Sequence, residues 1–199
     1  MTPARYQQAA RTLLRDTLLD AAGELMDEAP WSEISMAAIA AQAGVSRQTL
    51  YNEFGSRDDF AQAYVLREAD VFLTTVEEAF AQHADNPSEA LRVGFRTFLE
   101  QSEANPMVRN IIVREPGADE LFSLFTTRGG PVVELATLRL ADKISELWPE
   151  AEQRQVRIFA DALVRLAISH AGLPAGTPAQ AADDVTELLE ASMLDALGI

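Results

Sequence analysis

The chain has 199 residues, of which 48% are hydrophobic and 24% charged, and its formal net charge is −15 at pH 7. This length and balance are typical of one or two folded domains with a substantial core, not of a disordered chain. The absence of cysteine excludes disulfide scaffolds, thiol nucleophiles, zinc fingers and iron–sulfur centres. Neither histidine follows a glutamate at the spacing of a di-iron bundle, and no glycine precedes the single lysine as in a phosphate-binding loop. We therefore expect no metal and no cofactor.

No segment has the features of a membrane span or a signal peptide. The longest stretch without Asp, Glu, Lys or Arg, residues 166–182, is interrupted by two glycines and two prolines. The basic N-terminus lacks an apolar core before a small-residue cleavage site. These patterns predict a cytoplasmic protein with no membrane partner. The preference for arginine over lysine and the many alanines suggest a GC-rich bacterial genome.

Helical signals run along the whole chain, and no segment alternates apolar and polar residues as a half-buried strand does. Ser35, Ser46 and Ser56 are suited to cap helices, as are Asn86-Pro87 and Thr177-Pro178. The pattern predicts an all-α fold of about nine helices. They are expected over about 4–28, 36–42, 46–53, 57–82, from 87, from 106, 132–147, 150–171 and 179–197.

Residues 39–51 carry the strongest functional signal, because they have the pattern of a helix-turn-helix. Gly44 can adopt the positive φ of a tight turn, and Ser46 can cap the following helix. Three apolar residues are expected to close a small core with the stripe on the first helix: Ile39, Leu50 and Phe54. A helix presented in this way enters the major groove by its N-terminal residues. An ordinary α-corner is the alternative.

Polar side chains gather at the start of this second helix. Arginine can bond guanine and glutamine can bond adenine, while hydroxyl groups commonly bond phosphate. We therefore expect double-stranded DNA to be contacted by Ser46, Arg47, Gln48, Thr49, Tyr51 and Asn52. For Tyr51, partial burial in the small core is the alternative to a phosphate contact.

The sequence resembles the DNA-binding domain of the TetR family of transcriptional regulators over about residues 16–63. The residues that carry the resemblance are Ala43-Gly44-Val45-Ser46, Thr49-Leu50-Tyr51, Phe54, Ser56-Arg57 and Phe60. It implies a DNA-binding domain at 1–55 and a ligand-binding and dimerisation domain at 56–199. Arg57 stands where the family commonly has a phosphate-binding lysine, so it joins the expected DNA contacts; a surface pair with Asp58 or Asp59 is its alternative.

Charge is distributed unevenly near the N-terminus. Residues 1–15 carry three arginines and no acid, whereas residues 16–33 carry six acids and no base. Arg5 and Arg11 are candidates for phosphate contact, with solvated side chains as the alternative. Glu53 departs from the family pattern, and we expect it to face solvent, with acceptance from cytosine as the alternative. The net charge predicts weak nonspecific DNA binding and a shallow salt dependence.

The resemblance implies a small-molecule pocket in the larger domain, and apolar residues dominate there. The pocket is expected to include Phe95, Phe98, Leu99, Arg109, Ile112, Leu121, Phe122, Phe125 and Leu138. Such a lining favours a lipophilic effector, such as a fatty acid or an acyl derivative. A carboxylate on it could meet Arg96, Arg109, Asn110, Arg128 or Arg165, with a surface or structural role as the alternative for each. His170 is expected to serve helix packing, with ligand contact as the alternative.

The last two predicted helices carry apolar faces that one subunit need not cover. The expected dimer interface comprises Phe159, Leu163, Leu166, Leu188, Leu189 and Met193. Two copies would form a four-helix bundle with two-fold symmetry and a palindromic operator. Packing of these faces inside one chain is the alternative.

These features predict a ligand-responsive, homodimeric transcriptional regulator, in most of the family a repressor. No hydrolase, dinucleotide-binding or metalloprotease motif is present, so we expect no enzyme. A helical lipid-binding or interaction protein without sequence-specific DNA binding remains the alternative, supported by Glu53 and the acidic balance.

Overall fold

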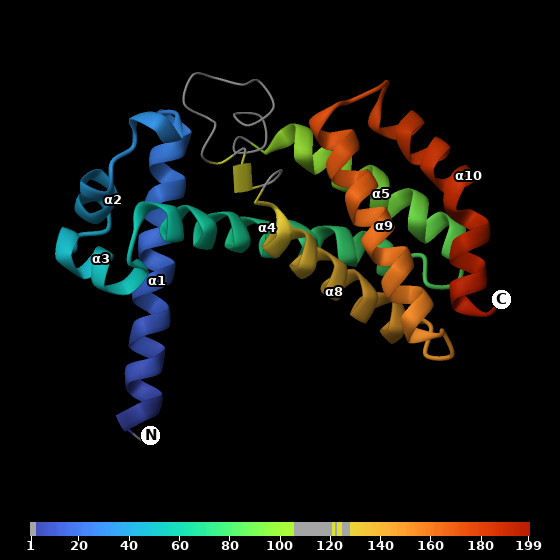
Figure 1. Ribbon diagram of the computed structural model, residues 1–199, viewed down its shortest axis with the longest axis horizontal. Coiled ribbons are helices and arrows are strands. Elements are labelled where there is room, and N and C mark those ends of the chain that lie inside the picture. Colours follow the sequence, from blue (N-terminus) through green and yellow to red (C-terminus); the bar gives the residue numbers. More distant parts are fainter. Residues whose placement is uncertain (1–2, 106–120, 122, 125–127) are drawn as a thin grey trace.

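The computed structural model describes residues 3–105, 121, 123–124 and 128–199. Within these residues all regular structure is helical, and the all-α prediction is confirmed (Figure 1). The elements are α1 (Pro3–Glu28), the 3₁₀ turn η1 (Trp31–Glu33), α2 (Met36–Gln42), α3 (Arg47–Phe54), α4 (Arg57–Ala81), α5 (Pro87–Ala104), α8 (Gly130–Leu147), α9 (Gln153–Gly172) and α10 (Pro178–Leu197).

The predicted caps form, and they fix where the helices begin. The hydroxyls of Ser35, Ser46 and Ser56 each accept a bond from the backbone N–H three residues later. Thr177 forms a full capping box with Gln180. The helix expected from about residue 150 begins later, because the Glu152 carboxylate caps the first turn of α9. The helix expected from residue 106 lies outside the described residues.

The N-terminal core is formed by α1 to α4. Leu18, Ile39 and Leu50 are fully buried, and Phe54 packs edge-on against Phe60 of α4. The expected closure of this core is therefore confirmed. The same cluster continues across residue 55 and takes in three residues from much later in the chain: Leu121, Leu124 and Val132.

Helix α4 runs from the N-terminal group of helices into the second group, formed by α5, α8, α9 and α10 (Figure 1). A second core lies there, with Phe80, Phe95 and Ile144 among its buried side chains. No helix in the described part of the chain is long and apolar enough to cross a membrane.

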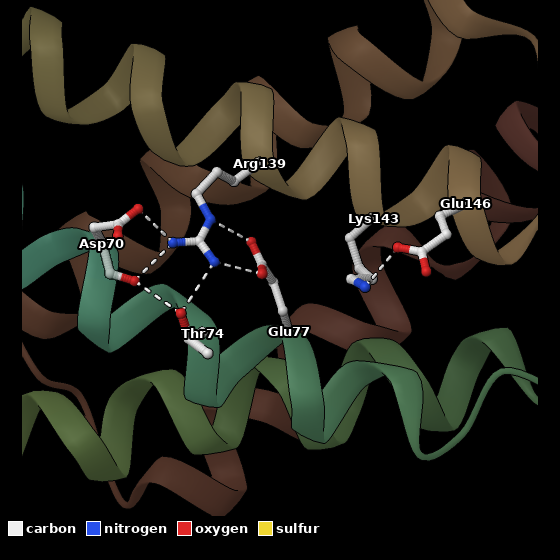
Figure 2. A network of polar contacts seen from close by, with 6 residues as sticks. All are labelled: Asp70, Thr74, Glu77, Arg139, Lys143 and Glu146. Atoms are coloured by element: carbon white, nitrogen blue, oxygen red, sulfur yellow. Dashed lines mark hydrogen bonds and ion pairs between the residues drawn. The ribbon is translucent and has the colours of Figure 1, made fainter. Parts of the chain in front are cut away.

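Two arginines tie α4 to α8 and the residues before it. Arg128 forms a bidentate pair with Asp58 in the first turn of α4, with N–O distances of 2.5 and 2.7 Å. Further along, the guanidinium of Arg139 in α8 bonds Glu77 and Asp70, and also the Thr74 hydroxyl (Figure 2). Because α4 belongs to both groups of helices, these pairs connect the second group to the N-terminal one.

Candidate nucleic-acid interface

The turn between α2 and α3 has the geometry expected of a helix-turn-helix. Gly44 adopts φ of 69°, a left-handed conformation that glycine tolerates without a steric cost. The next N–H, that of Val45, donates to the Ala40 carbonyl at 2.9 Å, and Val45 packs against the N-terminal core. The turn therefore holds α3 on the core by one face and leaves its other face uncovered.

Polar side chains occupy the uncovered face of α3. Arg47, Gln48 and Asn52 are exposed, and the Gln48 amide donates to the Asn52 side-chain oxygen at 2.8 Å. The Arg47 guanidinium lies over the Tyr51 ring, 5.3 Å from its centroid. The structure thus brings together four of the residues predicted to contact DNA, with amide and guanidinium groups that match the edges of adenine and guanine.

Tyr51, Ser46 and Thr49 are tied to the fold as well as to this surface. Tyr51 is half-buried against the N-terminal core. Partial burial of its ring and a phosphate contact by its hydroxyl, given above as alternatives, are therefore compatible. The hydroxyls of Ser46 and Thr49 lie 2.8 Å apart, and the Ser46 oxygen also caps the helix. Phosphate contact by these hydroxyls stays a prediction.

Arg57 serves the fold of the N-terminal core. Its two terminal nitrogens donate to the carbonyl oxygens of Trp31 and Ile34, and its guanidinium lies 4.2 Å from the Trp31 ring centroid. Asp58 and Asp59, named as its alternative partners, bind Arg128 and the Ser56 hydroxyl. A phosphate contact by Arg57 would have to share these bonds.

Glu53 does not face solvent as expected. Its side chain is 9% exposed, and its carboxylate accepts bonds from Arg11 and Arg15 of α1 at 2.9 Å. Burial raises the pKa of Glu53, but the hydrogen bonds and charges of the two arginines outweigh it and lower the pKa overall. The sequence offered only the local acid-free run of residues 1–15 as a hint of this pairing.

The residues predicted for the ligand pocket are not all brought together. Phe95 and Leu99 lie in the second core with Phe98 beside them, whereas Leu121 belongs to the N-terminal core. Leu138 is 38% exposed. Arg109, Asn110, Ile112, Phe122 and Phe125 lie outside the described residues. Three arginines named for a ligand carboxylate form ion pairs instead: Arg96 with Glu100, Arg128 with Asp58 and Arg165 with Asp161.

A mainly apolar cavity of about 170 Å³ lies beside Leu99. It is partly open to solvent and is lined by the C-terminal ends of α5 and α9, the connection between α9 and α10, and the start of α10. His170 lines it and packs edge-on against Phe95, with ring centroids 5.7 Å apart. His170 therefore serves helix packing, as expected, and also borders a space that a small apolar group could fill.

Comparisons with known proteins agree with this geometry. A family model described as bacterial regulatory proteins of the tetR family matches residues 18–64. Another, described as the C-terminal domain of the bacterial Tetracyclin repressor, matches residues 86–191. The HTH-type transcriptional regulator AlkX of Mycobacterium tuberculosis (strain ATCC 25618 / H37Rv) is 36% identical over 184 residues, which cover 92% of this chain and 87% of AlkX.

The chain belongs to the TetR family. Its fold is similar to the crystal structure of the TetR family repressor AlkX from Dietzia sp. strain DQ12-45-1b, implicated in biodegradation of n-alkanes. That match has a TM-score of 0.81 at 34% identity and covers 92% of this chain and 96% of the other. The Thermus thermophilus repressor FadR, solved with lauroyl-CoA, shares the fold at a TM-score of 0.58 and 24% identity, over 90% of this chain and 95% of FadR.

In this TetR-family regulator, α9 and α10 turn different residues outward from those predicted. Phe159, Leu163 and Met193 are buried by other helices of the same chain, so they form core and offer no surface to a second copy. Leu166 and Leu189 are half-buried, and Leu188 is 68% exposed. The outward stripe combines Leu188 and Ser192 on α10 with Ala162 and Ser169 on α9, and also includes Ile158, which sequence patterning missed.

Proposed function

We propose that this regulator is a homodimeric repressor that binds a palindromic operator through α3 and is released by a lipophilic small molecule. The observation that carries the DNA-binding part is the exposed polar face of α3, where Arg47, Gln48 and Asn52 stand together on a capped helix. Such a face supplies the donors and acceptors that base-edge recognition requires. No catalytic activity is proposed.

The test is selection of bound DNA from a random duplex pool. We expect one inverted repeat to be enriched by the wild type and weakened in Arg47→Ala and Tyr51→Phe. Tyr51→Phe removes only the hydroxyl, so the half-buried ring stays in place. Arg154→Ala, which removes an exposed arginine from α9, is the matched control and should select as the wild type does. A folded protein that enriches no repeat at any salt concentration would contradict the proposal.

Two observations support a lipophilic effector. The cavity beside Leu99 and His170 is mainly apolar, and a space of this size can hold a group as large as benzene. A repressor that is 34% identical and similar in fold is implicated in n-alkane degradation. Titrating the operator complex with saturated fatty acids of increasing chain length tests this. Release that depends on chain length is expected, and complexes that no member releases would contradict it.

Homodimer formation is supported by the outward stripe on α9 and α10. Ile158 and Leu188 provide apolar area, while Ala162, Ser169 and Ser192 are small enough to let two helices approach closely. A two-fold interface of this kind would place two copies of α3 on two half-sites of one operator.

The alternative of a helical lipid-binding protein without DNA binding has lost part of its support. It depended on Glu53 as a carboxylate on the DNA-facing helix, and that carboxylate is turned to α1 and bound by two arginines. The selection experiment separates the two functions.

A further inference from the structure

The positive charges of the N-terminal helices are mostly engaged within the chain. Five arginines lie between residues 3 and 65: Arg5, Arg11, Arg15, Arg47 and Arg57. Arg57 binds backbone carbonyls and Arg47 lies over Tyr51. Two others converge on one carboxylate, that of Glu53. Four of the five side chains are thus held by other groups of the chain, and the Glu53 carboxylate offsets one of the two charges beside it.

Glu53, Arg11 and Arg15 form a cluster, called here the Glu53 cluster, that joins α1 to the C-terminal end of α3. Arg11 Nε bonds both carboxylate oxygens, at 2.9 and 3.0 Å, while Arg15 Nη1 bonds one of them at 2.9 Å. The Arg15 guanidinium also lies 4.4 Å from the Phe54 ring centroid, so it is held from two sides. The carboxylate is therefore the innermost member, and the arginines lie outside it.

The outer members of the cluster remain accessible. The Arg11 side chain is 60% exposed and that of Arg15 is 37% exposed. Around them α1 continues past α2 and α3 at its N-terminal end (Figure 1), with every residue from 5 to 13 exposed and none acidic. Without the carboxylate the cluster would carry two positive charges, and with it the cluster carries one.

We propose that Glu53 is a charge-masking residue that holds Arg11 and Arg15 away from the phosphate backbone and so lowers the affinity of the regulator for DNA of any sequence. This rests on the proposed DNA-binding function and deepens it. Each cation that reaches a phosphate releases a counterion and adds affinity regardless of sequence. An internal carboxylate that occupies two cations removes this contribution while the base-reading face of α3 stays intact.

The experiment compares wild type and Glu53→Gln for binding to a duplex of scrambled sequence over a range of salt concentrations. The amide keeps the size of the side chain and removes its charge. We expect Glu53→Gln to bind roughly threefold to tenfold more tightly at low salt, the gain of two exposed ion pairs per dimer. We expect its salt dependence to steepen by about two units per dimer when one arginine of each protomer reaches a phosphate and by about four when both do, since each new phosphate contact adds about 0.9.

Glu78→Gln is the matched control, because it makes the same change in net charge at an exposed site on α4 and should leave both quantities unchanged. An equal change in Glu78→Gln would show a general charge effect and overturn the proposal. An unchanged or shallower salt dependence in Glu53→Gln would also overturn it, since Glu53 would then be only structural or would position the arginines on phosphates.

If Glu53→Gln alone does not fold, the same comparison is made in an Arg15→Gln background. In that background, removing the Glu53 charge does not leave two arginines side by side without a carboxylate between them. Arg15→Gln/Glu53→Gln should bind the scrambled duplex more tightly than Arg15→Gln. The selection experiment keeps the two proposals distinguishable. An enriched inverted repeat with unchanged salt dependence would overturn the masking role alone, whereas no enriched repeat would overturn the proposed function.

Discussion

At the first position of α4, the Arg57 guanidinium closes a small structural site made by η1 and the residue after it. The Trp31 carbonyl accepts the Ile34 N–H at 3.2 Å, and Arg57 donates to it and to the Ile34 carbonyl. The stacking on Trp31 adds a cation–π contact. The family resemblance implied a phosphate contact for Arg57, which stays a prediction, and it could not reveal these partners because η1 is too short to leave a periodic pattern.

Arg57→Ala is therefore expected to reduce the free energy of unfolding by about 2–3 kcal/mol, since two hydrogen bonds from a charged donor are lost, although the Trp31 carbonyl keeps the Ile34 N–H. Arg57→Lys should recover part of this loss, because lysine keeps the charge but not the forked geometry. Urea unfolding of both variants measures it. If Arg57→Ala is as stable as the wild type while its DNA affinity falls, the phosphate role predicted from sequence is the dominant one.

Glu53 also makes a prediction about pH. Its pKa is lower in the folded chain than in the unfolded chain, so its stabilising contribution is fully present above the unfolded value of about 4.3 and is lost as pH falls through the folded value. The difference in unfolding free energy between wild type and Glu53→Gln should be larger at pH 7 than at pH 3. Chemical denaturation at both pH values measures it, and a difference that is equal or larger at pH 3 would contradict the role of the ion pairs.

Among the elements, α4 and α8 show how two helices far apart in sequence are fixed side by side. Figure 2 shows the Arg139 guanidinium between Glu77 and Asp70 of α4, while Lys143, one turn further along α8, bonds Glu146 of its own helix. Arg139 and Lys143 are buried to the same degree, with 22% and 23% of their side chains exposed. They differ in whether they connect α8 to another helix.

We expect Arg139→Met to lower the free energy of unfolding by about 2 kcal/mol, because it leaves the half-buried Glu77 carboxylate without its bidentate donor. Lys143→Met, the matched control, should cost less than about 0.5 kcal/mol, as is usual for a pair within one helix. Thermal and urea unfolding measure both. Equal losses in the two variants would show that the link between the helices contributes nothing beyond burial of the side-chain stems.

The helices themselves were largely predictable from sequence, since caps and breaks are local. Ser35, Ser46 and Thr177 each cap a helix at the expected position. The partners of charged side chains were not predictable, because Glu53 meets Arg11 across 42 residues and Arg139 meets Glu77 across 62. Such contacts depend on how whole helices are placed, and no periodic pattern records that placement.

At the scale of the whole molecule, the predicted dimer surface differs from the outward face of α9 and α10 for the same reason: the sequence pattern does not record how the helices are placed. Apolar spacing predicted that one subunit would not cover these faces of α9 and α10, but the largest residues face inward. Phe159 and Met193 fill the second core, and smaller side chains lie outward around Leu188 and Ile158. Hydrophobicity alone therefore selected the core face as the predicted interface.

Leu188→Asp is expected to shift the protein toward the monomer, because two charges would meet across the proposed two-fold axis. Leu13→Asp is the matched control, since Leu13 on α1 has the same exposed fraction of 68%. Sedimentation at several protein concentrations measures the shift. A Leu188→Asp variant that stays as dimeric as Leu13→Asp would place the interface elsewhere.

The shared core around Leu121, Leu124 and Val132 has a consequence for any attempt to divide this chain. A fragment that ends after α4 would lack the leucines that complete its interior, and it would expose that apolar surface to water. A fusion of residues 1–65 to the regulatory half of another protein would expose the same apolar surface. It would be covered only if the other protein supplied apolar side chains in the positions of Leu121, Leu124 and Val132. We therefore expect chimaeras to fold only when the segment around residues 121–132 travels with the N-terminal helices.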